Sequence, residues 1–233
     1  MLDLTQIKVF YDGMDIEKYA STKCVQGFTT NCTFFSKYKI RNYTEYYNSI
    51  KDSLAGRPLS LQIWEDDQKA IEQIDAIHAL APEAYIKIPI LNTRGEYNTV
   101  VYTYAKEKRL RVNVTALHTN EHIDKVYELF GDYDEPFIVS IFVGPISDVG
   151  NDPSGFISYT VNKFRENSNA EILWAGCREV FSIYRAIQGG CHIITCPDSV
   201  IDKLEHLGKS CDELTIERVT TFRNDAITSQ LSI

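Results

Sequence analysis

The sequence has few cysteines and no closely spaced cysteine pair. Only 6 of its 233 residues are cysteine. They are Cys24, Cys32, Cys177, Cys191, Cys196 and Cys211. None of them forms the CxxC pair typical of zinc and redox sites, and a disulfide framework needs a higher density. We therefore expect free thiols and no metal site.

Long apolar runs and an excess of basic residues are also missing. No apolar stretch approaches the roughly 20 residues needed to span a bilayer, and the N-terminal MLDLTQIKVF lacks the basic flank and apolar core of a signal peptide. The net charge of -8 argues against binding nucleic acid or a membrane, because both favour a basic face. We expect a cytoplasmic protein. A phosphorylated substrate stays open, since it needs only a local arginine or helix N-terminus.

What the sequence does contain is one pattern, repeated eight times. Short β-branched, apolar segments lie at residues 7–13, 24–30, 59–64, 84–90, 111–117, 136–142, 170–176 and 191–197. Stretches with helical spacing lie between them at 65–80, 96–110, 120–133, 153–168 and 178–188. Strict alternation of strand and helix predicts a parallel sheet, and eight units predict a closed (β/α)8 TIM barrel. An open doubly wound sheet is the alternative, yet no GxGxxG follows the first strand.

We expect one barrel domain over residues 1–233. Residues 197–208 predict a final barrel helix, and residues 215–229 predict an extra C-terminal helix outside the barrel repeat. That extra helix either caps the barrel or contacts a neighbouring subunit. We expect a homo-oligomer, of a size that the composition does not determine.

The segment AYIKIPI, residues 84–90, places a lysine in an apolar run. Because side chains alternate along a strand, the three isoleucines share one face, and Lys87 lies with Tyr85 and Pro89 on the other. Isoleucines suit the layer between barrel and helices, so we expect Lys87 to point into the barrel. Proline lacks a ladder donor, so Pro89 predicts the strand's end. Lys87 then lies near the carboxyl rim, where barrel active sites are built.

Four other strands show the same division. The residues expected to face outward are Ile7, Val9, Tyr11, Leu59, Leu61, Ile63, Val112, Val114, Ala116, Phe137, Val139 and Ile141. Those expected to face inward are Asp12, Gln62, Asn113, Thr115, Ser140 and Phe142. A purely structural interior would be mainly Val, Ile and Leu, so polar residues late on several strands favour a functional site over a satisfied polar core.

A lysine removed from water has chemistry of its own. Desolvation lowers its pKa, which supplies the unprotonated amine that attacks a carbonyl to form a Schiff base. The alternative is that Lys87 pairs with a buried carboxylate such as Asp12. Asp12 in turn is either a proton acceptor or a cap for the helix of DGMDIEKY. GFTTN, residues 27–31, also fits a turn and helix cap, and His192 fits a structural histidine.

Together these segments resemble a known family. GFTTNCT is similar to the TTNP[ST] signature of the transaldolase and fructose-6-phosphate aldolase family, and AYIKIPI is similar to its lysine strand. VNVTAL, IVSIFVG, EILWAGCREVF and GCHIITCP match the later strands in order. The resemblance implies a class I aldolase of carbohydrate metabolism, in the pentose phosphate pathway, on a (β/α)8 barrel. It implies a sugar or sugar phosphate substrate and no cofactor.

The resemblance also implies roles for single residues. Lys87 matches the Schiff-base lysine, and Asp12 matches the base that deprotonates the substrate hydroxyl as the carbon–carbon bond breaks. Thr115 matches the threonine that positions a catalytic water. The residues that it places at the substrate are Thr30, Asn31, Asn113, Ser140, Phe142 and Arg178.

Several positions depart from the family pattern. Gln62 stands where transaldolases usually have a glutamate that works with the water; the aldolase subgroup has glutamine there but a tyrosine at the position of Phe142. Pro145 and Gly176 replace an arginine and a serine of the phosphate site, and Cys32 replaces the signature proline. Each lost charge-assisted hydrogen bond would weaken phosphate binding by roughly 1.5–3 kcal/mol.

Two functions are therefore open. The first is a transaldolase-like enzyme in which Lys87 forms an imine with a ketose and passes on or releases a dihydroxyacetone unit, from an atypical sugar. The second is a catalytically weakened relative that acts as a binding or assembly protein, with Lys87 only paired to Asp12. The joint presence of Lys87, Asp12, Asn113 and Thr115 favours the enzyme.

Overall fold

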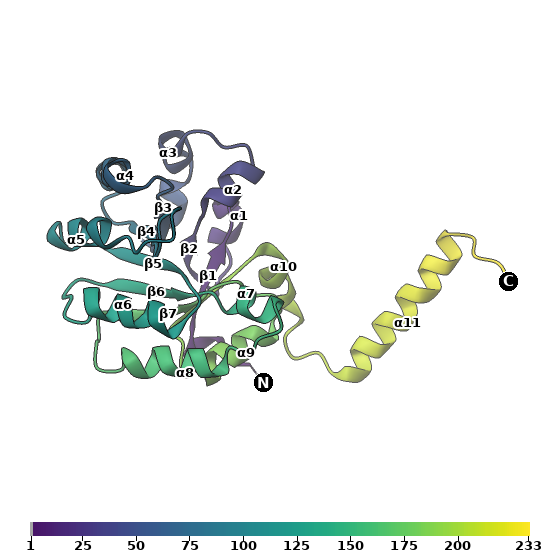
Figure 1. Ribbon diagram of the computed structural model, residues 1–233. Coiled ribbons are helices and arrows are strands. Elements are labelled where there is room, and N and C mark those ends of the chain that lie inside the picture. The colour runs from purple at the N-terminus through teal and green to yellow at the C-terminus, as the bar shows by residue number, and fades with distance from the viewer. Residues whose placement is uncertain (1) are drawn as a thin grey trace.

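Eight parallel strands close into a barrel that forms the body of the molecule (Figure 1). The computed structural model describes residues 2–233. The strands are β1 (Lys8–Asp12), β2 (Val25–Thr29), β3 (Leu59–Gln62), β4 (Tyr85–Pro89), β5 (Val112–Leu117), β6 (Phe137–Ile141), β7 (Ala170–Trp174) and β8 (Ile193–Cys196). Each pairs in parallel with its neighbours in chain order, and β8 closes the barrel on β1.

Helices connect the strands and surround them. They are α1 (Ile16–Ala20), α2 (Cys32–Lys37), α3 (Tyr43–Leu54), α4 (Asp67–Leu80), α5 (Thr99–Glu107), α6 (Asn120–Phe130), α7 (Val143–Asp148), α8 (Ser154–Lys163), α9 (Phe181–Gln188), α10 (Asp198–Ile201) and α11 (Cys211–Thr228), with 3-10 turns η1 (Leu4–Gln6) and η2 (Asp202–His206). The eight expected strand segments and five expected helical stretches each contain the predicted element. The (β/α)8 prediction is confirmed.

The helices differ from the expected ones in three places. Helix α3 is rich in tyrosine, which favours strands by propensity, yet Tyr46, Ile50 and Leu54 recur one turn apart and are buried. Residues 197–208, expected as a single helix, divide into α10 and η2. The C-terminal helix begins at Cys211 rather than 215, because Ser210 and Glu213 form a capping box.

The strand side chains divide between two apolar clusters, as the alternation predicts. The outward-facing residues join the large core between strands and helices. A smaller cluster inside the barrel contains Phe10, Tyr85, Ile138, Leu173, Ala175 and Ile193. A Cβ on Gly27 would lie 2.5 Å from the Phe10 ring, so glycine allows that ring to occupy the interior. The polar residues two positions further along these strands lie above this apolar layer.

Strand β5 departs from the expected alternation after Thr115. Ala116, predicted to face outward, adopts a left-handed φ of 63°. The pairing with β6 shifts between Val114 and Leu117, and Leu117 instead continues the outward core. An irregularity of this kind bends a strand and re-aims its side chains. The outward prediction for Ala116 was therefore wrong.

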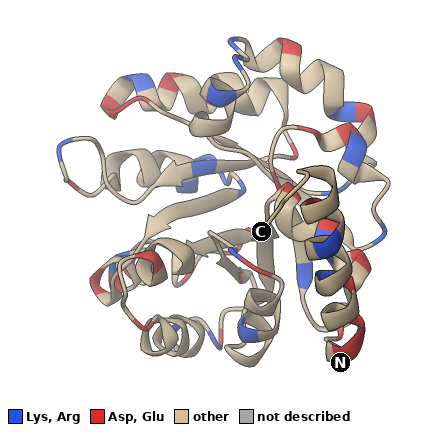
Figure 2. Ribbon diagram, turned by 90° about the vertical axis from the view of Figure 1, so that its right-hand side faces the viewer, with Lys and Arg blue, Asp and Glu red and all other residues tan. Residues whose placement is uncertain are grey.

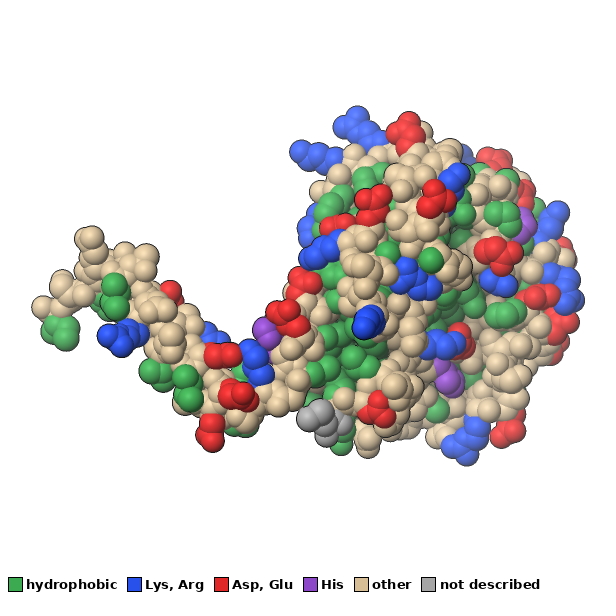
Figure 3. All heavy atoms as spheres, turned by 180° about the vertical axis from the view of Figure 1, so that it is seen from behind, with side chains coloured by type: hydrophobic (Ala, Val, Ile, Leu, Met, Phe, Trp, Pro, Cys, Tyr) green, Lys and Arg blue, Asp and Glu red, His purple; other side chains and the backbone are tan. Residues whose placement is uncertain are grey.

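Helix α11 extends away from the barrel. Figures 1 and 3 show it as an arm that leaves the body after η2, and none of its residues is buried. Its large apolar residues are at least half exposed: they are Leu214, Ile216, Val219, Phe222 and Ile227. The arm therefore carries apolar surface that its own barrel does not cover.

The remaining surface is mixed in charge. In the ribbon of Figure 2, positions of basic and of acidic residues are interspersed along the elements. The six cysteines are all free thiols. No helix within residues 2–233 combines the length and the apolarity that crossing a membrane requires.

Candidate active site

Lys87 lies inside the barrel near the carboxyl end of β4. Lys87 is only 7% exposed. The strand register pairs it with Gln62 on β3 and with Asn113 on β5. The Nζ atom donates a hydrogen bond to the carbonyl oxygen of Thr30 at 3.2 Å. Burial lowers the pKa of the Lys87 amine, and the negative charge of Asp12 acts in the opposite direction. The amine is thus held in surroundings that favour its neutral, nucleophilic form.

Asp12 stands at the end of β1, close enough to influence Lys87 but not bonded to it. None of the ion pairs formed by lysines in residues 2–233 involves Lys87. The Asp12 carboxylate instead accepts a hydrogen bond from Thr29 Oγ1 at 2.8 Å. Burial raises the pKa of Asp12, while Lys87 and the Thr29 hydrogen bond lower it. A carboxylate whose ionised form is disfavoured in this way is suited to accept a proton.

The helix-cap interpretation of Asp12 was wrong. The N-terminus of α1 is capped by Asp15, whose carboxylate accepts a hydrogen bond from the Lys18 backbone N–H at 3.3 Å. Two residues, Gly13 and Met14, separate the two aspartates, so the chain turns after β1 before the helix begins. Asp12 is left free to face the barrel interior.

A buried amide sits beside Lys87. Asn113 is fully buried; its Nδ2 donates to Ser60 Oγ at 3.0 Å, and its Oδ1 accepts from Ser140 Oγ at 2.7 Å. Both ends of the amide are therefore held, which fixes its orientation within the site. The structure brings together Asn113 and Ser140, both predicted substrate contacts, and adds Ser60.

Thr115 carries a buried hydroxyl without a partner. The residue is 2% exposed, and its Oγ1 has no hydrogen bond to any residue in the described part of the chain. Buried polar atoms are seldom left unpaired. The hydroxyl is thus available to a bound substrate or a water, and its role in positioning a catalytic water stays a prediction.

Gln62 and Phe142 lie at the carboxyl ends of β3 and β6. Gln62 ends β3, and its carbonyl oxygen accepts a hydrogen bond from Tyr43 at 2.7 Å. Phe142 packs against the apolar interior cluster, and its ring centroid lies 5.2 Å from that of His118. Neither side chain places a carboxylate or a phenol at the predicted water site.

The loop after β2 uses its polar side chains structurally. Asn31 caps α2 by accepting a hydrogen bond from the Phe34 N–H at 3.1 Å. The Thr30 hydroxyl donates to the carbonyl oxygen of Ser60 at 2.9 Å. The turn-and-cap interpretation of this segment is confirmed, and the substrate roles of Thr30 and Asn31 stay predictions.

The loops after β6 and β7, to which the resemblance assigns a phosphate site, pack tightly against each other. Gly144 N–H donates to the Ala175 carbonyl at 3.2 Å. Gly176 has a left-handed φ of 77°, and a Cβ on it would lie 2.8 Å from Pro145 Cδ. Arg178 is engaged by Asp148 through two hydrogen bonds, with Nε 3.3 Å from Oδ1. The single remaining arginine of the predicted phosphate site therefore has an internal partner.

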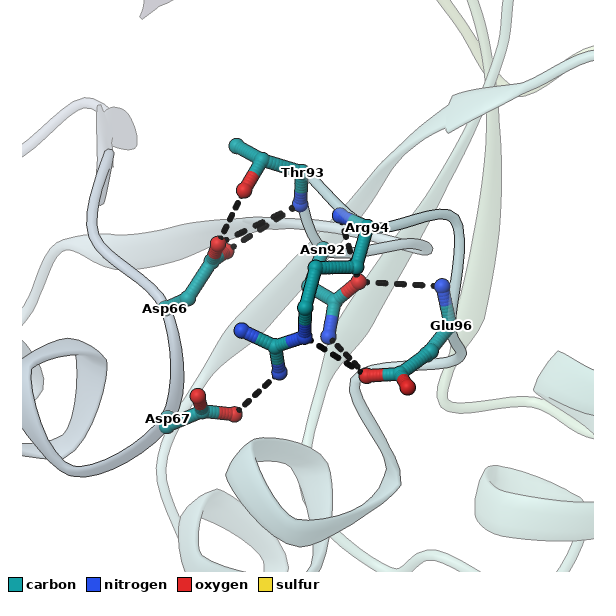
Figure 4. A network of polar contacts seen from close by, with 6 residues as sticks. All are labelled: Asp66, Asp67, Asn92, Thr93, Arg94 and Glu96. Atoms are coloured by element: carbon teal, nitrogen blue, oxygen red, sulfur yellow. Dashed lines mark hydrogen bonds and ion pairs between the residues drawn. The ribbon is translucent and has the colours of Figure 1, made fainter.

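A polar network links the loops that follow β3 and β4 (Figure 4). The loop after β4 meets the start of α4, where Asp66 accepts hydrogen bonds from the Thr93 N–H at 3.3 Å. Arg94 joins Asp67 and Glu96, each at 2.9 Å. Because these loops follow β3 and β4, the network holds together the ends of the strands that carry Gln62 and Lys87.

Three hydroxyl residues at the site were not predicted, namely Ser60, Thr29 and Thr195. The signal was present in the alternation, because Thr29 lies two positions after the inward-facing Gly27 and Thr195 two after Ile193. Thr29 Oγ1 lies 2.5 Å from Thr195 Oγ1. Alternation along β2 and β8 would have placed both inside the barrel.

Comparison with known proteins agrees with this geometry. A family model described as Transaldolase/Fructose-6-phosphate aldolase matches residues 2–232. The chain belongs to the transaldolase and fructose-6-phosphate aldolase family. Among its relatives, a "Probable transaldolase" of Oceanobacillus iheyensis is 26% identical over 191 residues, covering 82% of this chain and 85% of the relative.

Two further relatives of this transaldolase-like enzyme show a similar distance. A "Probable transaldolase 2" of Listeria monocytogenes is 27% identical over 192 residues, covering 82% of this chain and 83% of the relative. A "Probable transaldolase" of Dehalococcoides mccartyi is 28% identical over 200 residues, covering 84% and 88%. Each of these matches covers more than four fifths of both chains.

Proposed function

We propose that this family member is a class I aldolase that works through a Schiff base on Lys87. The observation that carries the proposal is a buried lysine at the carboxyl rim of the barrel, whose surroundings lower its pKa and which forms no ion pair with a carboxylate of residues 2–233. Its Nζ attacks the carbonyl carbon of a ketose, and water leaves to give the imine.

Asp12 then serves as the base. It takes the proton from the hydroxyl on the carbon beyond the bond to be cleaved, and that carbon leaves as an aldehyde. The bonding electrons stay on the lysine-bound three-carbon unit as an enamine. Addition of the enamine to an acceptor aldehyde gives transfer, whereas protonation and hydrolysis give release of dihydroxyacetone. Asn113 and Ser140 hold the three-carbon unit, and Thr115 holds the water for imine formation and hydrolysis.

We further propose that the sugar is atypical, with a weakly held phosphate or none. Three features support this: Pro145 in place of an arginine, Gly176 in contact with Pro145, and Arg178 already paired with Asp148. A phosphate would have to displace Asp148 from Arg178 before it could bind there. The binding energy available from a phosphate is correspondingly reduced.

A donor comparison tests the proposal. Aldehyde release is measured with fructose 6-phosphate and with fructose, for wild type and for Lys87→Met. We expect activity that requires Lys87 and an advantage of the phosphorylated sugar below about tenfold in kcat/KM. A micromolar KM for fructose 6-phosphate with normal turnover would contradict the altered phosphate site, and full activity of Lys87→Met would contradict the lysine mechanism.

The second candidate function is a binding or assembly role without turnover. The observation that favours it is the absence, at Gln62 and Phe142, of the carboxylate and the phenol that family members use. Folded wild-type protein that binds dihydroxyacetone, detected by calorimetry, but releases no aldehyde from any ketose would support this role over the enzyme.

We also propose that α11 docks on a second copy of this chain, giving a homo-oligomer. Apolar residues lie on more than one side of the helix, since Ile216 and Phe222 are about a third of a turn apart. A helix with apolar residues on several sides is normally buried, yet α11 stands clear of a barrel that is already closed (Figure 3).

The cytoplasmic location expected from the sequence stays a prediction.

A further inference from the structure

Two threonine hydroxyls form a line behind Asp12. β1 is flanked by β2 and β8 in the barrel, and the register places Thr29 beside Asp12 and Thr195 beside Phe10. Thr29 Oγ1 lies 2.8 Å from Asp12 Oδ1 and 2.5 Å from Thr195 Oγ1. Thr29 is 1% exposed and Thr195 3%. Bulk water therefore cannot replace either hydroxyl.

The number of protons fixes the direction of these hydrogen bonds. Each threonine hydroxyl has one proton to donate. An ionised Asp12 can only accept, so the Thr29 proton points to the carboxylate. The contact between the two threonines then requires Thr195 to donate to Thr29. With Asp12 ionised, the line runs in one direction only, from Thr195 through Thr29 to the carboxylate.

We propose that Thr195 is a positioning residue for the base Asp12, acting through the Thr29 hydroxyl. This rests on the proposed function only in assigning Asp12 the role of base. By donating to Thr29 Oγ1, Thr195 keeps the Thr29 hydroxyl turned so that its proton points to Asp12. It also strengthens the hydrogen bond from Thr29 to Asp12, because successive hydrogen bonds strengthen one another. When Asp12 takes the substrate proton, the new carboxyl proton can point to Thr29 and both threonine protons can turn the other way. The line thus accommodates both protonation states of the base.

Other groups also act on Asp12. Lys87, on β4, favours its ionised form. Asp198, in α10, opposes ionisation, and its own carboxylate accepts a hydrogen bond from Tyr11 at 3.4 Å. Cys196, next to Thr195 on β8, is a buried thiol whose pKa is raised well above its usual value, so it stays neutral. A substitution at Thr195 leaves Lys87, Asp198 and Cys196 in place. Its effect on the Asp12 pKa therefore passes through the Thr29 hydroxyl.

The test is a direct titration of the Asp12 carboxyl in the full chain. Protein carrying 13C-labelled aspartate is titrated by NMR, and the Asp12 signal is assigned by its loss in Asp12→Asn. Thr195→Val, which keeps the shape but removes the hydroxyl, is expected to raise the Asp12 pKa by roughly 0.2–0.7 unit, a fraction of the effect of a whole charge-assisted hydrogen bond. Thr29→Val is expected to raise it more, and Thr195→Ser is expected to match wild type.

A matched control separates this effect from lost stability. Thr160→Val removes another buried threonine hydroxyl, which donates to the Phe156 carbonyl on α8, and is expected to leave the Asp12 pKa unchanged. An unshifted Asp12 in Thr195→Val, or equal shifts in Thr195→Val and Thr160→Val, would overturn the proposal. The titration needs no turnover, so a protein that forms no imine would contradict the proposed function and still give a result for Thr195.

Discussion

The close packing of Pro145 on Gly176 allows us to predict how much stability the protein would lose if residue 176 were changed to the serine of the family pattern. Gly176 has a φ of 77°, in a region that costs a residue with a Cβ about 1–2 kcal/mol. Its Cβ would also lie 2.8 Å from Pro145 Cδ and 3.1 Å from Gly144 Cα. Overpacking of this kind adds about 1–3 kcal/mol. We therefore expect Gly176→Ser to reduce the free energy of unfolding by about 2–5 kcal/mol.

The chain offers a matched control at Gly56. That glycine has the same φ of 77°, but a Cβ there would meet nothing within 4 Å. Gly56→Ser should therefore show only the backbone cost of about 1–2 kcal/mol. Urea titration of the two variants measures the difference, and Gly176→Ser combined with Pro145→Ala should regain part of it.

Two results would refute this reasoning. Equal losses in Gly176→Ser and Gly56→Ser would show that Pro145 does not crowd the site. A lower KM for fructose 6-phosphate in Gly176→Ser alone, in a stable protein, would show that the serine is accommodated without a change at Pro145 and contributes to phosphate binding.

Three further predictions concern the amine, the acid–base group and the C-terminal arm. Burial holds the Lys87 pKa below its usual 10.5, so borohydride trapping at limiting ketose should rise with pH and level off below pH 10.5. Asp12→Asn removes a negative charge that raises this pKa, so trapping in that variant should level off at a lower pH than in wild type. A plateau at a higher pH would contradict the assigned effect of Asp12. Gln62→Glu should increase turnover if a missing carboxylate limits the rate, and unchanged or lower turnover speaks against that account. Phe222→Glu should reduce the mass measured by light scattering to that of a smaller species, while Asn224→Glu should not; an unchanged mass for both would argue against docking through α11.

The fold could be predicted from the sequence because barrel strands are doubly constrained. Each must be apolar toward the helices and must end at a rim, so the segments around Lys87 and Asn113 show both the alternation and the change to polar residues. Helix α3 was missed because its tyrosines favour strands locally, and only packing of Tyr46, Ile50 and Leu54 on the barrel decides the matter. The bulge at Ala116 was also invisible, since nothing in VNVTAL marks a left-handed residue.

The candidate site was predictable to the same extent. Lys87, Asp12, Asn113 and Ser140 follow from alternation, and the structure brings them to one end of the barrel. The hydrogen bonds at the site do not follow from alternation. Ser60 and Thr195 each reach a partner two strands away, and the stagger of those strands depends on closure of the barrel. The pairing of Arg178 with Asp148 likewise depends on how two loops pack, which sequence spacing does not encode.

The central claim is that Lys87 forms a covalent imine with a ketose. Intact-protein mass is measured after incubation with dihydroxyacetone or fructose 6-phosphate and borohydride, for wild type and Lys87→Ala. The account predicts one reduced adduct that maps to Lys87 and is absent from the variant. Folded wild-type protein with no adduct from several ketoses, or an adduct that persists in Lys87→Ala, would contradict it.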